Sequence, residues 1–153
     1  MVVLPTEVGA QYNRNYIYWM GQQCMVDNNY REAIDVLNVL LRSDDKDFDA
    51  YFLRGIAKYN MDDLLGADAD FSRAVMLNPV FTGAFYYRAI TRSRLGNYDD
   101  ALSDFRQAIE LRPDLRGRAR RSLAVSIGMH RAIVRQRHCS RLGCGQHAPP
   151  PLT

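Results

Sequence analysis

Acidic residues are absent from the last quarter of this sequence, since no Asp or Glu follows Asp114. Eight of the 20 basic residues lie in that stretch, so residues 1–115 carry a net charge of about −5 and the remainder is strongly basic. No apolar run approaches the ~18 residues of a membrane-spanning helix, which excludes an integral membrane protein of the helical class. The first ten residues also lack the basic segment and apolar stretch of a secretory signal.

Cysteine is scarce and odd in number, because the chain has only three. This count argues against a disulfide scaffold and favours a reducing compartment, the cytoplasm first. Cys24 lies among apolar residues and is expected to be a small buried hydrophobe rather than a nucleophile.

Metal and catalytic patterns are also missing. The candidate zinc ligands have an order and a spacing that match no standard set, so neither a metal nor another cofactor is expected. These ligands are His138, Cys139, Cys144 and His147. All three histidines lie in the basic segment without an acidic partner nearby, which predicts that the chain is not an enzyme. The acidic residues around the middle of the chain are interpreted as a solvated helix start and face: Asp62, Asp63, Asp68 and Asp70.

What the sequence does contain is an internal repeat. Pro79 and Pro113 each follow an apolar segment, and they lie 34 positions apart. Sliding residues 48–81 onto 82–115 without a gap gives nine identities, which are Ala50, Arg54, Ile56, Ala67, Asp70, Phe71, Ala74, Leu77 and Pro79 with their counterparts. A further step back of the same length reaches Ala33, Leu37 and Leu40. Such a period is typical of a helical repeat array.

Each unit reads as two helices joined by a turn. Small residues at one position of the first helix, Gly21, Gly55 and Ala89, predict close approach by a neighbouring helix. Asn and Gly then indicate a turn, and apolar residues at helical spacing form the second helix. Proline ends that helix, except in the first unit, where a polar loop at 43–47 takes its place. The predicted helices are 12–26, 30–43, 48–60, 64–77, 82–95 and 98–111.

This pattern resembles the tetratricopeptide-repeat family. The resemblance implies an all-α, right-handed helical-repeat solenoid of three helix-turn-helix units and a capping helix. The expected organisation is a lead-in at 1–13 and repeats over 14–115, divided as 14–47, 48–81 and 82–115. A basic helix at 116–137 follows, because Arg135 falls where a fourth unit would need a small residue. Residues 138–153, rich in Gly, Pro and His, are expected to be disordered.

The resemblance also implies a binding site on the concave face, which the first helix of each unit lines. The residues assigned to it are Tyr18, Gln22, Met25, Phe52, Ile56, Tyr59, Asn60, Tyr86, Ile90 and Arg94. Some family members hold a chaperone's C-terminal carboxylate there with Lys, Asn and Arg. This chain has aromatic and aliphatic residues at those positions, which favours a protein or peptide ligand with apolar anchors. Arg94, with Arg88 or Arg92, is expected to meet an acidic group.

Three alternatives stay open at this stage. The aromatic residues of the concave face could pack between repeats instead of binding a partner. An incompletely covered third unit could stack on another copy, which would make the chain a self-associating scaffold. The basic C-terminal segment could contact nucleic acid or an anionic membrane surface, although the acidic repeats disfavour both partners.

Overall fold

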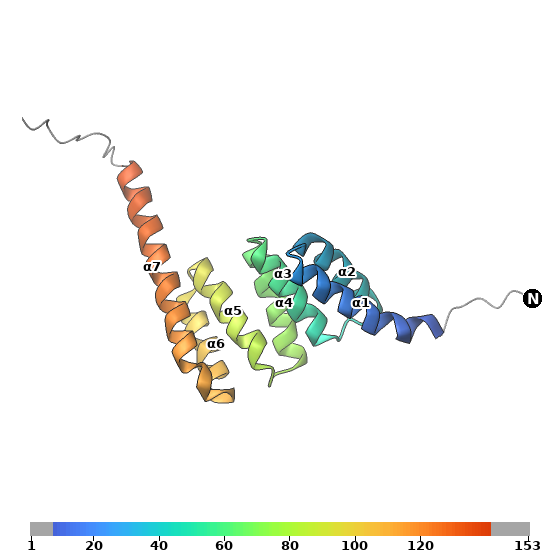
Figure 1. Cartoon of the computed structure of the whole chain (residues 1–153). Helices are drawn as coiled ribbons and strands as arrows, with labels where there is room; N and C mark the ends of the chain where they lie inside the picture. Colours follow the sequence, from blue (N-terminus) through green and yellow to red (C-terminus); the bar gives the residue numbers. More distant parts are fainter. Residues whose placement is uncertain (1–7, 142–153) are drawn as a thin grey trace, which may run out of the picture.

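The computed structural model describes residues 8–141, which form seven α-helices and no strand (Figure 1). The helices are α1 (Val8–Val26), α2 (Tyr30–Ser43), α3 (Phe48–Asn60), α4 (Leu64–Leu77), α5 (Thr82–Leu95), α6 (Tyr98–Leu111) and α7 (Arg116–Arg141), with a 3-10 turn at Pro113–Leu115. The predicted helices are therefore confirmed, except that α1 begins at Val8 rather than at residue 12. Successive helix pairs stack along one axis, which makes the all-α repeat solenoid that the sequence predicts.

The turn inside each unit has the same backbone geometry. Asn28, Asp62 and Gly96 lie one repeat period apart, and all three have a positive φ, of 58°, 65° and 87° respectively. Asn, Asp and Gly adopt this left-handed conformation at the lowest cost, so the turn depends on those residue types. The connections between units are extended at Asp44, Asn78 and Arg112.

The small residues of the first helices do lie where a neighbouring side chain approaches closely. A Cβ added to Gly21 would lie 3.3 Å from Leu37, sixteen residues later in the second helix of the same unit. A Cβ added to Gly55 would lie only 2.7 Å from the ring of Phe71, again sixteen residues later. Ala89 and Phe105 repeat this pair in the third unit. The sequence period therefore describes a repeated contact as well as a repeated helix.

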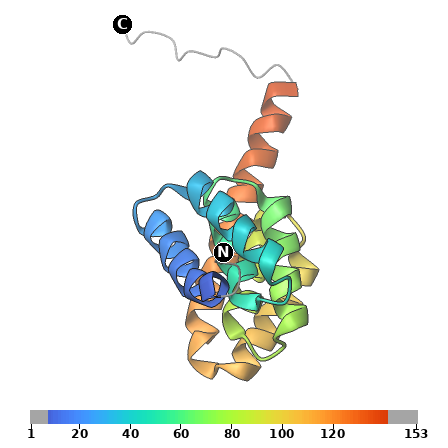
Figure 2. The ribbon, with the colours of Figure 1, turned by 90° about the vertical axis from the view of Figure 1, so that its right-hand side faces the viewer.

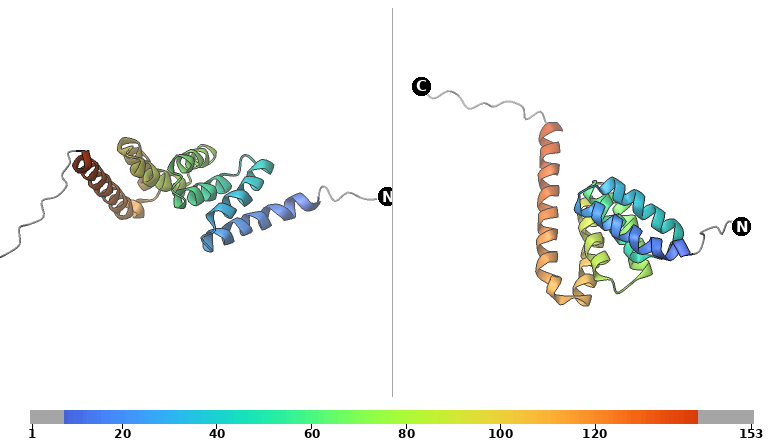
Figure 3. Two further views of the ribbon diagram at one scale, coloured as in Figure 1. Left: turned by 90° about the horizontal axis from the view of Figure 1, so that it is seen from above. Right: turned by 45° about the vertical axis from the view of Figure 1, so that its right-hand side comes forward.

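The last helix covers the third unit and then continues beyond it. Leu115 and Ala119 are buried against residues of α5 and α6, so the third unit is not left open as one alternative required. Figure 3 shows α7 projecting past the helices it packs on. The prediction of disorder from residue 138 is wrong for residues 138–141, which continue α7 because the first Gly or Pro after them is Gly143. Residues 142–153 lie outside the described range.

Within residues 8–141, none of the helices combines the length and the apolar character that crossing a bilayer requires.

Candidate functional site

The ten residues assigned to the concave face lie on the first helices of the three units. α1 holds Tyr18, Gln22 and Met25, α3 holds Phe52, Ile56, Tyr59 and Asn60, and α5 holds Tyr86, Ile90 and Arg94. Most are half-buried, whereas the three longest polar side chains among them, those of Gln22, Asn60 and Arg94, are exposed. The repeat period therefore places these residues on equivalent helices, but only some of them line a common groove.

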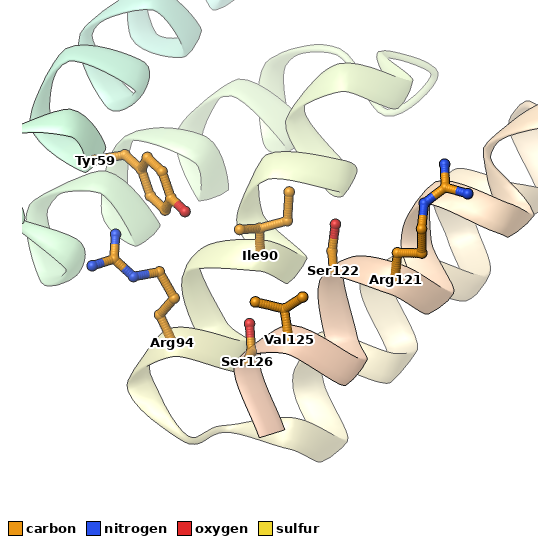
Figure 4. Close-up of a pocket in the computed structure, with 7 residues that line it drawn as sticks. All are labelled: Tyr59, Ile90, Arg94, Arg121, Ser122, Val125 and Ser126. Atoms are coloured by element: carbon orange, nitrogen blue, oxygen red, sulfur yellow. The ribbon is translucent and has the colours of Figure 1, made fainter. Parts of the chain in front are cut away.

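Three of these residues line one groove. Tyr59, Ile90 and Arg94 face a hollow of about 470 Å³ between α3, α5 and α7 (Figure 4). The guanidinium of Arg94 lies 4.9 Å from the ring centre of Tyr59, a cation–π contact. Its Nη2 also donates to Oδ1 of Asp62 over 2.6 Å, but the Asp62 side chain is 75% exposed. An ion pair this open to water contributes little, so Arg94 can exchange Asp62 for another carboxylate at low cost.

The opposite wall of the groove comes from α7. The residues are Arg121, Ser122, Val125 and Ser126. Val125 is 58% exposed, so it offers apolar surface to the groove, and Arg121 adds a second exposed guanidinium. The sequence did not predict that α7 lines the groove, because α7 does not follow the 34-residue period. The one signal in the sequence was the mixture of Arg, Ser and aliphatic residues in α7, which is typical of a half-buried helix.

Hydrogen bonds hold α7 against α5 at the back of the groove. The hydroxyls of Tyr86 and Ser122 lie 3.1 Å apart, and Ser93 Oγ donates to Ser126 Oγ over 2.9 Å. The guanidinium of Arg118 lies 5.5 Å from the ring centre of Tyr86. Tyr86 therefore helps to hold α7 in position. Its side chain is partly covered by that helix rather than fully available on the predicted binding face.

Phe52 has a different environment from the groove residues. Its ring packs edge-on against Phe81, at 4.8 Å between ring centres, and against Tyr87 at 5.5 Å. Phe71 lies 5.9 Å away on α4. These contacts tie α3 to α4 and α5, which is the inter-repeat packing that the sequence left open as an alternative for this face. A role for Phe52 in binding stays a prediction.

The other end of the predicted face is neutral to acidic. Burial raises the pKa of the Tyr18 phenol, and the nearby charges of Asp49 and Asp47 raise it further. Burial also raises the pKa of Asp49, with the neighbouring carboxylate of Asp47 adding to the effect. The two ends of the face therefore differ in charge, since the end formed by α5 and α7 presents Arg94 and Arg121.

Paired charges inside the array correct two predictions. The guanidinium of Arg88 binds both oxygens of Asp104, at 2.9 and 2.6 Å, and Arg92 joins Asp104 to Asp68. Arg54 binds both oxygens of Asp70 in the same way, one repeat period earlier. Asp68 and Asp70 are therefore not a solvated face, and Arg88 and Arg92 are not available to a partner. The pairing was missed because helical periodicity does not show which charges meet across two helices.

The cysteine interpreted as a buried hydrophobe is buried. Cys24 packs with Ala33 and Ala57, and burial raises the pKa of its thiol, with Glu32 and Asp27 adding to the shift. We expect Cys24 to be alkylated by iodoacetamide at least roughly tenfold more slowly in the folded chain than in urea, because little thiolate forms at pH 7. Peptide mapping by mass spectrometry measures this for each cysteine separately. Equal rates for Cys24 in the two conditions would contradict its burial.

Among the residues whose side chains are described, no cluster of His, Cys, Asp or Glu has the arrangement of a metal site. The side chains of the candidate zinc ligands from His138 onward lie outside that set. The groove between α3, α5 and α7 is therefore taken as the candidate binding site.

Comparisons with known proteins agree with this architecture. A family model described as tetratricopeptide repeat matches residues 83–115. Human sperm-associated antigen 1 is 30% identical over 95 residues, which cover 62% of this chain and 10% of that protein. The UDP-N-acetylglucosamine–peptide N-acetylglucosaminyltransferase of Giardia intestinalis is 29% identical over 143 residues, with 76% of this chain and 10% of that enzyme covered. The chain spans about a tenth of the length of these two relatives.

Solved structures give the same result for the fold. The first TPR of Spaghetti (RPAP3), bound to an HSP90 peptide, is similar with a TM-score of 0.71. The sequences are 23% identical, and the match covers 77% of this chain and 93% of that one. A likeness at this level of identity shows that the two share a helical-repeat array.

Proposed function

The chain belongs to the tetratricopeptide-repeat family, and we propose on that basis that it is a non-catalytic interaction module that binds a protein or peptide segment. The observation that carries the proposal is the groove between α3, α5 and α7. Ligand grooves combine apolar surface with a few polar groups that set orientation. Here Ile90 and Val125 provide the apolar part, and two arginines provide the polar part.

The chemistry of the groove indicates its ligand. A segment with an aliphatic anchor next to an acidic residue would place the anchor between Ile90 and Val125. Its carboxylate would then meet Arg94 and Arg121, because guanidinium groups form strong paired hydrogen bonds with carboxylates. The Tyr18 end of the face, which lies near Asp47 and Asp49, disfavours a second acidic group there.

The proposal differs from binding of a chaperone terminus. The similar Spaghetti structure holds an HSP90 peptide. In this chain the positions that form the carboxylate clamp of such family members carry Tyr18, Gln22, Phe52, Ile56, Tyr86 and Ile90. The arginines of the groove instead lie in the last turn of α5 and the second turn of α7, away from those positions, so we propose an internal acidic segment rather than a chaperone C-terminus.

The test begins with peptides selected from a random displayed library against the whole chain. For the selected peptides, we expect Arg121→Gln to weaken binding by roughly tenfold or more, since a charge-assisted hydrogen bond contributes about 1.5–3 kcal/mol. Fluorescence anisotropy of a labelled peptide measures the dissociation constant. Val125→Glu should weaken binding as well, because it places a like charge beside the ligand's carboxylate.

Arg120→Gln is the matched control. Arg120 is exposed on the same helix and carries the same charge, but it does not line the groove. We expect this variant to bind within about twofold of the original chain, because an exposed charge far from the contact has little effect. Equal losses in both variants would indicate binding through the overall charge of α7, and no loss in either would mean that the groove is not the site.

A further inference from the structure

An aromatic face at the first end of the array is not used by the groove or by the core. Tyr16 and Trp19 of α1 are 54% and 53% exposed, and their rings stack with centres 6.0 Å apart. Gln23 and Val26, which continue the same stripe at helical spacing, are exposed too, Val26 by 72%. Figure 2 views the array from this end, where α1 lies at the front.

The equivalent residues of the second and third units show which contacts this face of the first helix makes there. A step of one repeat period from Tyr16, Trp19 and Gln23 leads to Ala50, Leu53 and Ala57 on α3. Ala50 and Ala57 are fully buried, and they pack with Leu37, Leu40 and Ala33 of the preceding α2. The next step leads to Ala84 and Thr91 on α5, which are fully buried as well. This is the face by which each unit packs on the unit before it.

On α1 the equivalent face carries two large aromatic rings and is open. Among the described residues, this face of α1 is exposed, whereas the third unit is covered by α7. Exposed Trp and Tyr at such a face are the residue types that dominate binding energy in protein interfaces.

The charge of the face points to a second copy of the chain as the occupant. No charged residue occurs between Arg14 and Asp27, so the exposed stripe of α1 is free of charge over its described length. Two such faces meet without like-charge repulsion, and interface centres are generally depleted in charged residues. A two-fold pair also needs only this one surface, because the same patch serves on both partners.

We propose that α1 packs against α1 of a second copy, so that the chain forms a two-fold symmetric dimer through Tyr16, Trp19 and Val26. The groove lies at the opposite end of the array, between α3, α5 and α7, and stays open in this dimer (Figure 1). The dimer would thus present two binding grooves facing away from each other.

The experiment uses the chain's single tryptophan, since Trp19 reports on its own surroundings. Sedimentation equilibrium of the whole chain should show a monomer–dimer equilibrium, and the emission of Trp19 should shift to shorter wavelength as the dimer forms. Trp19→Lys and Trp19→Glu should each weaken self-association by roughly tenfold or more, the loss expected for an interface hot spot. An equimolar mixture of the two variants should restore a dimer, because opposite charges then face each other across the two-fold axis.

Leu65→Lys is the control, since Leu65 is 74% exposed on α4 and the substitution adds the same charge. It should leave the dimer unchanged. A chain that stays monomeric up to several hundred micromolar would overturn the proposal. So would a Trp19→Glu variant that associates as strongly as the original while Trp19→Lys does not, because that result indicates pairing of α1 with the arginine-rich α7 of another copy. Peptide binding in the groove should be the same for both Trp19 variants, which separates this test from the proposed function.

Discussion

Asp104→Asn should lower the free energy of unfolding by about 3–5 kcal/mol, the cost of removing one partner from a buried ion pair. The Asp104 side chain is only 5% exposed, and it holds Arg88 through two hydrogen bonds and Arg92 through one. Asparagine keeps the shape but leaves the Arg88 guanidinium, itself only 13% exposed, without a counter-charge. Urea unfolding followed by circular dichroism measures the difference.

Two further variants make this prediction specific. Glu110→Gln removes an exposed carboxylate from the same helix and should change stability by less than about 0.5 kcal/mol. The first unit has Met20 and Val36 at the positions of Arg88 and Asp104. The double substitution Arg88→Met and Asp104→Val should therefore recover most of the loss, because an apolar pair can replace a buried ion pair. A single Asp104→Asn variant as stable as the original would show that water already screens these charges.

Gly55→Ala should destabilise the array although alanine is the better helix former. A Cβ at this position would lie 2.7 and 2.9 Å from two ring carbons of Phe71, which is fully buried. Overpacking of this kind costs about 1–3 kcal/mol, and occasionally more, whereas the gain in helix propensity is about 0.5–1 kcal/mol. We expect a net loss of about 1–2 kcal/mol, because the buried ring of Phe71 also packs against Phe52 and Tyr87 and cannot move freely.

Gly128→Ala gives the opposite sign from the same substitution. Gly128 lies within α7, and a Cβ there would meet nothing within 4 Å. This variant should gain about 0.5–1 kcal/mol from helix propensity alone. Combining Gly55→Ala with Phe71→Leu should cost less than the sum of the two single changes, since a smaller side chain makes room for the new methyl group. An additive result would mean that the two positions do not compete for space.

The sequence predicted the fold closely because its signals are local. Each helix is marked by apolar residues at helical spacing, and each turn by residues that tolerate a positive φ, as at Asn28 and Gly96. The site was predictable only in part. Tyr59, Ile90 and Arg94 could be assigned from their repeat positions, whereas Arg121 and Val125 could not, because α7 departs from the period.

A signal for the buried ion pairs was present in the sequence but is hard to interpret. Arg54 and Asp70 are separated by sixteen residues, as are Arg88 and Asp104 and as are Gly55 and Phe71. In each of these pairs, the first residue lies on the first helix of a unit and contacts the second residue on the second helix of the same unit. Helical periodicity instead suggests a solvated acidic face, because it describes one helix at a time.

By itself the sequence determined the repeat unit, the helix boundaries, the turn geometry and the small residues at close contacts, since all of these depend on neighbours along the chain or on one repeated packing step. The tertiary structure alone decided which charges are paired inside the array, that α7 forms a wall of the groove, and that the aromatic stripe of α1 is exposed. These features depend on which helix faces meet in space, and helical periodicity does not contain that information because it describes one helix at a time.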